Sequence, residues 1–382
     1  MKKGNKGEWS EPYAAIKMIG EKKLFLADKN DSKNPNEWME IIELIRHETS
    51  DRIVKYTYGL ENVIVDIFVN DELIISVDAN QFLIFAEKLA VEIRNGKGKS
   101  FSIPDETLKF LKHIEINHIK AKAIDKSDIF LSIMDPRASI VRNHIGFSIK
   151  SEFGENPTLF NTAKSSAAVF EISNITDDLM NEINQIFITK KDKNGKEKTN
   201  VAVGERCNKL IQSGCKLKFV GFPIASRAKC AAFAENLDLI DPRLPIVIAT
   251  ILWNHFFDHS SNIDIDKVIQ EIIEINPCGL YRPDIKYPYM MKSFLYAAYC
   301  GMTASTLWDG TSQVNGGMIK VKNNGDLIAY YALESDIFKT YLYNNCYLEF
   351  PSTDEKHGDY AKVYKMNDRY YFNLNFQIRY RV

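Results

Sequence analysis

The sequence contains no C-x-x-C pair, although six cysteines are spread over its 382 residues. This distribution fits reduced thiols in a cytosolic protein better than a disulfide framework or a zinc ribbon. No apolar run is long enough to cross a bilayer, because the most hydrophobic stretch, residues 244–257, includes Asn254 and His255. The N-terminal residues MKKGNKGEWSE also lack the apolar segment of a secretory signal. We therefore expect a soluble, cytoplasmic protein without a membrane partner.

The chain also lacks an excess of charge of either sign, since 49 lysine and arginine residues face 50 acidic residues. Overall charge therefore argues neither for nor against nucleic acid, and DNA binding would require local clusters of basic side chains. G-x-S-x-G, protein-kinase and Rossmann patterns are absent as well. With 45% hydrophobic residues, the length is sufficient for two or three domains that each bury an ordinary core.

The spacing of apolar residues predicts an α/β protein of the mixed α+β kind, with a central mixed sheet flanked by helices and a helical and β-rich C-terminal region. In the first half we expect helices over 10–19, 37–48, 81–94 and 105–114, and strands over 52–58, 62–70 and 72–77. In the second half we expect helices over 205–213, 225–235, 245–255, 264–274 and 289–300, and strands over 316–321, 326–331 and 370–380. The pattern turns helical near residue 204, which suggests domains over 1–203 and 204–382.

A lysine-rich turn, KKDKNGKEK, occupies residues 190–198. Its Asn194-Gly195 pair is a strong signal for a hairpin. Such a turn usually lies in solvent, and contact of its lysines with DNA phosphates is the alternative.

The most informative segment is SDIFLSIMDPRASIVRNHIGFSIKS, residues 127–151. It predicts two strands joined at the Asp-Pro pair, because proline restricts φ and aspartate can hydrogen-bond to its own backbone. Side chains alternate between the faces of a strand, so Ser148 and Lys150 share one face of the second strand. Folding back at the turn brings Asp128, at the start of the first strand, close to Lys150. This layout is typical of a metal-dependent phosphodiesterase, whereas a hairpin whose polar face meets only water is the alternative.

Hydrolysis of a phosphodiester at such a hairpin requires a divalent cation, and hard oxygen ligands favour Mg²⁺. Asp128 would be one ligand and the main-chain carbonyl of Ile149 a second. Lys150 would orient or deprotonate the attacking water and offset charge in the transition state. The position two residues before the lysine is usually Glu or Asp in these sites, but here it is Ser148, a poor metal ligand. One carboxylate is therefore missing.

Three acidic residues could supply the missing carboxylate. Glu11 lies in the first turn of a helix that we expect to be capped by Ser10, and the small residues that follow would let this helix approach a sheet closely. Its carboxylate could instead only favour the helix dipole, which is worth ~0.3–1 kcal/mol when exposed. Glu8 and Glu152 are the other two donors, and the sequence does not rank the three.

Three passages together resemble the HpaII-type restriction endonucleases, a branch of the PD-(D/E)xK nuclease superfamily. They are NKGEWSEPYAAIKMIGEKKLFLAD, IGFSIKSEFGENPTLFNTAKSS, and the tail from GMTASTLWDG through LEFPST to FNLNFQIRY. The resemblance spans nearly the whole chain, and GFSIKS and GEWSE are its most specific motifs. It implies a PD-(D/E)xK-type nuclease core in the first half, with catalytic positions at Asp128, Ser148 and Lys150 and with Glu11 beside them. Serine at the usual acid position departs from the superfamily pattern.

The resemblance further implies a hydrolase that cleaves double-stranded DNA with Mg²⁺, leaving 5′-phosphate and 3′-hydroxyl ends. It implies a restriction-modification system, in which a partner methyltransferase protects host DNA. Asn161 and Thr162 would lie near bound DNA, although an Asx or ST turn would also explain them. Arginine reads guanine and Asn or Gln reads adenine, and the candidates for DNA contact in the C-terminal half are Gln313, Asn315, Lys320 and Arg379. Cutting both strands of a symmetric site favours a homodimer.

Two other functions fit the same residues. A repair or junction nuclease on this core would read the shape of DNA instead of its sequence. A non-catalytic DNA-binding protein with a decayed nuclease site is compatible with Ser148, whereas Asp128 and Lys150 on one expected face argue against it.

Overall fold

The computed structural model describes residues 3–59, 63–124, 127–191, 195, 197–222, 232–258, 262–312, 314–353 and 360–381. Two compact units make up the chain: Met1–Pro157 with Ser312–Tyr341, and Thr158–Thr311 with Leu342–Arg381. They do not coincide with the division at residue 204 expected from the sequence, which falls inside the second unit. In each unit, strands that are far apart in the sequence pair with one another. A change in the local sequence pattern does not reveal such long-range pairings.

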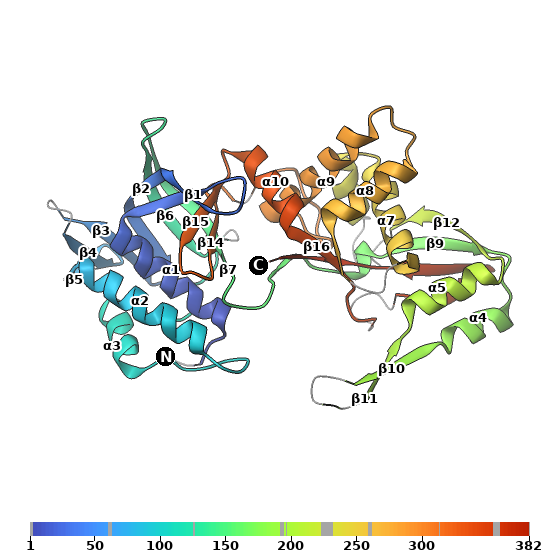
Figure 1. Ribbon diagram of the computed structural model, residues 1–382, viewed down its shortest axis with the longest axis horizontal. Coiled ribbons are helices and arrows are strands. Elements are labelled where there is room, and N and C mark those ends of the chain that lie inside the picture. Colours follow the sequence, from blue (N-terminus) through green and yellow to red (C-terminus); the bar gives the residue numbers. More distant parts are fainter. Residues whose placement is uncertain are drawn as a thin grey trace. The chain divides into compact units, whose positions relative to one another are not determined.

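Within the described residues, the first unit contains a nine-stranded mixed sheet (Figure 1). Its strands, in order across the sheet, are β1 (Lys23–Ala27), β15 (Leu327–Tyr331), β14 (Gly317–Val321), β7 (Ile140–Ser151), β6 (Ile129–Asp135), β2 (Lys33–His47), β3 (Ile53–Tyr58), β4 (Ile64–Val69) and β5 (Glu72–Asp78). Strand β7 pairs in parallel with β14 and antiparallel with β6. The hairpin expected from the sequence therefore lies inside the sheet.

Helices cover one face of this sheet, where α1 (Lys6–Glu21) and α2 (Ala79–Asn95) lie side by side and α3 (Asp105–His113) packs on α2 (Figure 1). Phe147 and Ile149 of β7 belong to the same buried core as Trp9 and Tyr13 of α1. Because side chains alternate along a strand, the other face of β7 carries the neighbours of these residues. The side chains of Ser148 and Lys150 therefore lie on the face of β7 opposite Phe147 and Ile149.

One predicted helix of the first half, over residues 37–48, was wrong, because this segment belongs to strand β2. A β-bulge between Ile41 and Glu43 interrupts the alternation of side chains. As a result Ile42 is exposed, while the nearest apolar residues before and after it, Ile41 and Leu44, are buried. The bulge makes the spacing of buried residues resemble a helical period, which explains the error. The other helices and strands expected in this half are confirmed within the described residues.

The second unit contains two four-stranded sheets and a separate hairpin within the described residues. The sheets are β12 (Lys216–Gly221), β9 (Ala168–Ser173), β18 (Arg369–Leu374) and β17 (Val363–Met366), and β13 (Ile263–Asp264), β16 (Cys346–Glu349), β19 (Gln377–Tyr380) and β8 (Thr158–Phe160). The hairpin, β10 (Phe187–Lys191) with β11 (Glu197–Val201), confirms the strand pair expected around the lysine-rich turn. The pairing of β9 with β12 and β18 joins the middle of the chain to its end.

The remaining elements of the second unit are mostly helical. They are η1 (Lys164–Ser166), α4 (Asp177–Asn184), α5 (Val203–Gln212), α6 (Ala232–Ile240), α7 (Leu244–Asp258), α8 (Ile265–Ile275) and α9 (Pro283–Cys300), while α10 (Ser335–Asn345) runs from the first unit into the second. In the described part of the chain, no helix combines the length and apolar character needed to cross a membrane.

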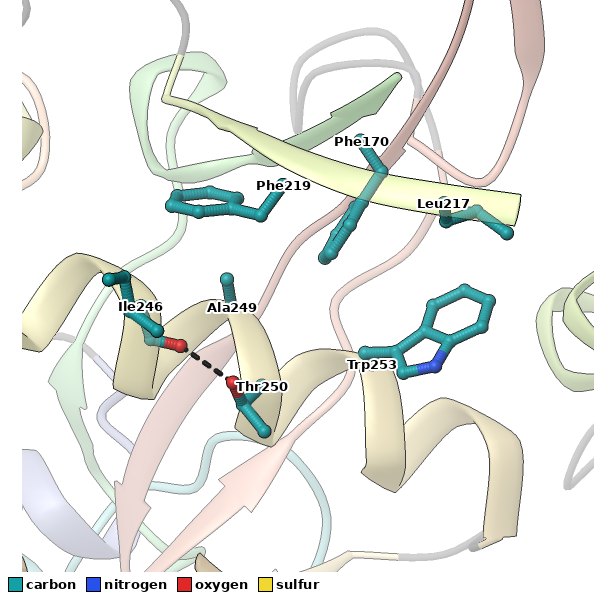
Figure 2. A pocket seen from close by; sticks show the side chains of 7 residues that line it. All are labelled: Phe170, Leu217, Phe219, Ile246, Ala249, Thr250 and Trp253. Atoms are coloured by element: carbon teal, nitrogen blue, oxygen red, sulfur yellow. Dashed lines mark hydrogen bonds between the residues drawn. The ribbon is translucent and has the colours of Figure 1, made fainter. Parts of the chain in front are cut away.

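A small pocket of about 140 Å³ lies between α7 and the strands β9 and β12 (Figure 2). Its lining is apolar and aromatic, and the hydroxyl of Thr250 donates to the Ile246 carbonyl of the same helix at 2.8 Å. The residues around it are Phe170, Leu217, Phe219, Ile246, Ala249, Thr250 and Trp253. None of these side chains carries a charge, so the pocket has no group suited to phosphodiester chemistry.

Candidate active site

Strand pairing brings Asp128 to the end of β7. Ile129, the first residue of β6, pairs with Phe147. The N–H of Asp128 donates to the carbonyl of Phe147 at 2.8 Å. The Asp128 carboxylate in turn accepts the N–H of Ile149 through Oδ2 at 2.7 Å. Asp128 therefore lies beside the last residues of β7, which are the SIK residues of the sequence motif.

The same bonds orient the carbonyl of Ile149. In an extended strand the N–H and C=O of one residue point to the same side. Because the Ile149 N–H faces Asp128, the Ile149 carbonyl faces that side too. The ammonium of Lys150 donates to this carbonyl at 3.3 Å. A carboxylate, a carbonyl oxygen and an amine thus converge at the point where β6 begins.

A close approach at Gly146 sets the position of the Asp128 backbone. A Cβ atom on Gly146 would lie 2.1 Å from the Oγ of Ser127, the buried residue just before Asp128. Only glycine leaves room for Ser127 there. The Gly146 N–H also donates to the Oδ1 of Asn315 at 2.7 Å, which fastens this part of β7 to the start of β14.

Glu11 approaches the hairpin from α1. Its side chain is 7% exposed, and Oε2 accepts the N–H of Ala121 at 3.0 Å. Burial raises the pKa of Glu11 to about 7, and the negative charge of Asp128 adds to this rise. The Ala121 hydrogen bond and the positive charge of Arg46 act in the opposite direction. The negative charge of Asp128 thus opposes ionisation of Glu11, and a bound cation would favour the ionised carboxylate.

Helix α1 begins earlier than expected, which moves Glu11 from the first turn to the second. The N-cap is Asn5 and not Ser10, and Asn5 and Glu8 form a capping box. Ser10 lies within the helix, where its hydroxyl donates to the Ser151 hydroxyl of β7 at 2.7 Å. This contact and fully buried alanines, Ala14 and Ala15, confirm the close approach of helix and sheet.

Of the three acids that could complete the site, two are engaged elsewhere. Glu8 accepts the N–H of Asn5 at 2.8 Å in the capping box. Glu152 accepts the ammonium of Lys322 at 2.5 Å and lies 3.2 Å from that of Lys320. Glu11 is the one whose carboxylate interacts with Asp128. Glu8 and Glu152 are thus committed to the helix cap and to two lysines, whereas Glu11 interacts with Asp128.

The environment of Lys320 argues against the DNA contact expected for it. Its side chain is 1% exposed, and its ammonium donates to Asp31 at 2.6 Å. Lys322 also donates to Asp31, at 2.8 Å, and the hydroxyl of Tyr330 donates to the same carboxylate at 2.5 Å. A buried ammonium held by carboxylates is not presented to a ligand. Lys320 therefore has a structural role in the sheet.

The other residues expected to contact DNA differ in their exposure and in their partners. Asn315 is exposed but its Oδ1 is engaged with β7, as described above. In the second unit, Asn161 is exposed, while the hydroxyl of Thr162 is buried without a hydrogen-bond partner among the described residues. Arg379 of β19 is partly exposed and pairs with Glu349. Gln313 lies outside the described residues.

The donor set around Asp128 suits a hard cation. Where the structure describes side chains, no group of three or more His, Cys, Asp or Glu residues is arranged to hold a metal. Mg²⁺ does not need one, since it is usually bound through one or two carboxylates and keeps several waters. Asp128, Glu11 and the carbonyl of Ile149 together offer oxygen ligands of this kind. The residues present therefore fit Mg²⁺ better than Zn²⁺, which prefers nitrogen and sulfur ligands.

Comparison with known proteins shows the family to which the chain belongs. A model of the family described as HpaII restriction endonuclease matches residues 5–380, which include α1, the β6–β7 hairpin and β14. The chain belongs to this family. The type II restriction enzyme HpaII of Haemophilus parainfluenzae is 30% identical to it over 384 residues, covering 99% of this chain and 98% of that enzyme. No solved structure matches the chain.

Sequence reasoning missed the segment that holds Glu11. Within residues 117–122, the main-chain N–H of Ala121 donates to Glu11. Because this contact uses the main chain, the residue types of the segment gave no indication of it. The segment belongs to a long connection between α3 and β6. Long connections without regular structure are uncommon in compact domains and often functional, and this is the one signal that could have pointed to it. In this member of the HpaII family, the connection lies beside both acidic residues of the site.

Proposed function

We propose that this type II restriction endonuclease cleaves double-stranded DNA where Asp128, Glu11 and Lys150 converge, with Mg²⁺ as its cofactor and on a PD-(D/E)xK-type core. The carrying observation is the double engagement of Asp128, whose carboxylate binds the Ile149 N–H at 2.7 Å and interacts electrostatically with Glu11. The products would carry 5′-phosphate and 3′-hydroxyl ends.

Each residue then has a distinct role. Asp128, Glu11 and the Ile149 carbonyl would hold the ion, which when bound neutralises the scissile phosphate and makes a water molecule more acidic. The Lys150 amine would hold the attacking water by a hydrogen bond, take part in its deprotonation and oppose the charge of the transition state. Ser148 stands where the superfamily has an acid, and its hydroxyl shares the face of Lys150. Glu11 would replace the carboxylate that Ser148 lacks.

The second unit would contribute to the grip on DNA. It carries Asn161, Thr162 and Arg379, and an arginine that reads guanine or an asparagine that reads adenine would give sequence specificity. A homodimer would place one catalytic centre on each strand of a symmetric site. The enzyme would act in the cytoplasm together with a methyltransferase that protects the host's own sites.

A repair or junction nuclease is the second candidate on the same residues, and family membership disfavours it. A non-catalytic DNA-binding protein is disfavoured because Asp128, Lys150 and a compensating acid are all present at one end of β7.

Incubation of the purified protein with a methylation-free plasmid and Mg²⁺ tests the proposal, with Lys150→Ala as the control. Discrete fragments that the variant does not produce are expected, and their mapped ends would give the site. A smear that depends on Lys150 would instead favour the repair-type nuclease. No cleavage by the wild type on several plasmids, with Mn²⁺ also tried, would overturn the catalytic assignment.

A further inference from the structure

Arg46 and Glu48 form a buried ion pair at the end of β2. The guanidinium of Arg46 donates through Nε to the Oε1 of Glu48 at 2.6 Å, and both side chains are almost completely buried, at 1% and 0% exposure. Buried ion pairs are weak contributors to net stability, because desolvation offsets their attraction. Their presence therefore calls for a reason other than stability.

Both members of the pair bind the main chain of the segment 117–119. Arg46 donates through Nη2 to the carbonyls of His118 and Ile119, at 2.7 and 2.9 Å. Glu48 accepts through Oε2 the N–H groups of Asn117 and His118, at 2.9 and 2.7 Å. The segment has no helix or strand of its own, so its buried polar groups need such partners.

A further bond holds the segment from the other side. The N–H of Lys122 donates to the carbonyl of His47 at 2.8 Å. Ala121 lies directly before this anchor, and its N–H is the group that donates to Glu11 at 3.0 Å. The chain on either side of Ala121 is thus fastened to the end of β2, which restricts the direction of the Ala121 N–H.

We propose that Arg46 and Glu48 are positioning residues of the catalytic centre, which hold the segment 117–122 so that the Ala121 N–H keeps the Glu11 carboxylate beside Asp128. This inference rests on the proposed function, since it assigns Glu11 to the centre. The pair does not touch DNA or the reacting atoms. Its role resembles that of the outer hydrogen bonds that orient metal-binding carboxylates in other sites.

Glu48→Gln tests the proposal, because glutamine preserves the shape of the side chain but cannot accept all of the bonds that the carboxylate accepts. Loss of such an outer partner typically costs about 10–100-fold in metal affinity or activity. We expect a fall of this size in the single-turnover cleavage rate and a higher Mg²⁺ concentration for half-maximal rate. DNA affinity without divalent cation should not change. Circular dichroism and thermal unfolding would verify that the variant is folded at the assay temperature.

Glu115→Gln is the matched control. Glu115 pairs with Arg52 at the start of the same connection, and both side chains are partly exposed. Glu115→Gln makes the same chemical change in the same region. The Glu115 carboxylate accepts the side-chain amide of Asn117 at 3.3 Å, but neither it nor Arg52 binds the main chain of 117–122 in the described contacts. Its cleavage rate and Mg²⁺ requirement should remain within about two-fold of the wild type, as expected for a substitution away from the site.

A double-mutant cycle with Glu11→Gln separates positioning from a merely structural role. If Glu48 acts through Glu11, then Glu48→Gln should cost almost nothing further in the Glu11→Gln background. An undiminished loss in that background, or a folded Glu48→Gln variant with wild-type cleavage, would overturn the proposal. Should Glu48→Gln fail to fold, His118→Ala replaces it in the cycle, since it removes only the contact of Nδ1 with Glu48 at 3.0 Å and its side chain is half exposed.

Failure of this inference is distinguishable from failure of the proposed function. If Asp128→Asn and Lys150→Ala abolish cleavage while Glu48 and Glu11 do not couple, only the positioning role is lost. If Asp128→Asn and Lys150→Ala both cleave normally, the catalytic assignment itself falls.

Discussion

Lys150 of β7 and Lys320 of β14 are partners in the register of two neighbouring parallel strands, so their side chains share one face of the sheet. Their environments differ completely. Lys320 is buried between the carboxylates of Asp31 and Glu152, whereas Lys150 is partly exposed and reaches back to the carbonyl of Ile149. Asp31 and Glu152 balance the charge of Lys320, whereas Lys150 is the lysine that lies beside Asp128 in the proposed site.

Exchanging each of these lysines for methionine should separate stability from activity. Lys320→Met leaves two partly buried carboxylates with one partner fewer, and we expect it to lower the free energy of unfolding by roughly 3 kcal/mol. Lys150→Met should change that free energy by less than about 0.5 kcal/mol, as at other partly exposed positions, but reduce the cleavage rate about 10²–10⁴-fold. Urea unfolding and single-turnover cleavage measure the two effects. Equal stability losses in both variants would contradict the distinction.

Gly146 should not tolerate a methyl group. In Gly146→Ala the new Cβ would lie 2.1 Å from the Oγ and 2.7 Å from the Cβ of Ser127, so Ser127 and Asp128 must shift. We expect a stability loss of about 1–3 kcal/mol, typical of overpacking, together with a marked fall in cleavage rate. Ser127→Gly in the same chain removes both clashing atoms and should restore much of each property. If the double variant cleaves no better than Gly146→Ala, displacement of Asp128 is not the cause.

Glutamine substitutions should rank the three acids near the site. Glu11→Gln is expected to raise the Mg²⁺ requirement and to slow cleavage by at least the ~10–100-fold seen for groups that only support a ligand. Because the Glu11 carboxylate is buried near Asp128, the neutral amide should not destabilise the metal-free protein. Glu8→Gln should affect only the helix cap, by about 1 kcal/mol or less. Glu152→Gln should affect stability more than cleavage, and the reverse result would make Glu152 the missing ligand.

The cluster around Asp31 should make stability depend on pH in the acid range. Burial alone would raise the pKa of Asp31, but hydrogen bonds from Lys320, Lys322 and Tyr330 outweigh it and hold the pKa below its usual value. The pKa of Glu152 is lowered in the same way by Lys322 and Lys320, against the effect of burial.

A depressed pKa means that both carboxylates stabilise the fold above their unfolded-state pKa values, about 3.9 and 4.3. That stabilisation is lost as pH falls below these values and through the lower pKa values of the folded state. Urea unfolding between about pH 3 and 6 should show the decline, and Asp31→Asn should reduce its slope. An identical slope in the variant would exclude Asp31 as a contributor.

Local sequence determined the β6–β7 hairpin. Alternation of polar and apolar residues, with an Asp-Pro turn, was sufficient to place Asp128 beside the end of β7, because both signals act over a few neighbouring residues. The same reasoning failed for β2, where a single bulge shifted the alternation and imitated a helix. It also failed at α1, where the capping box of Asn5 and Glu8 starts the helix before Ser10.

The sequence by itself therefore determined the family, the hairpin and the position of Asp128 beside the end of β7. Only the tertiary structure decided that Glu11 accompanies Asp128 and that Lys320 is buried. The deciding contacts join residues far apart in the chain: Glu11 and Ala121 are 110 positions apart, and Asp31 and Lys320 are 289 apart. The burial and charge around a side chain depend on which distant segments pack against it, and local periodicity carries no information about those segments.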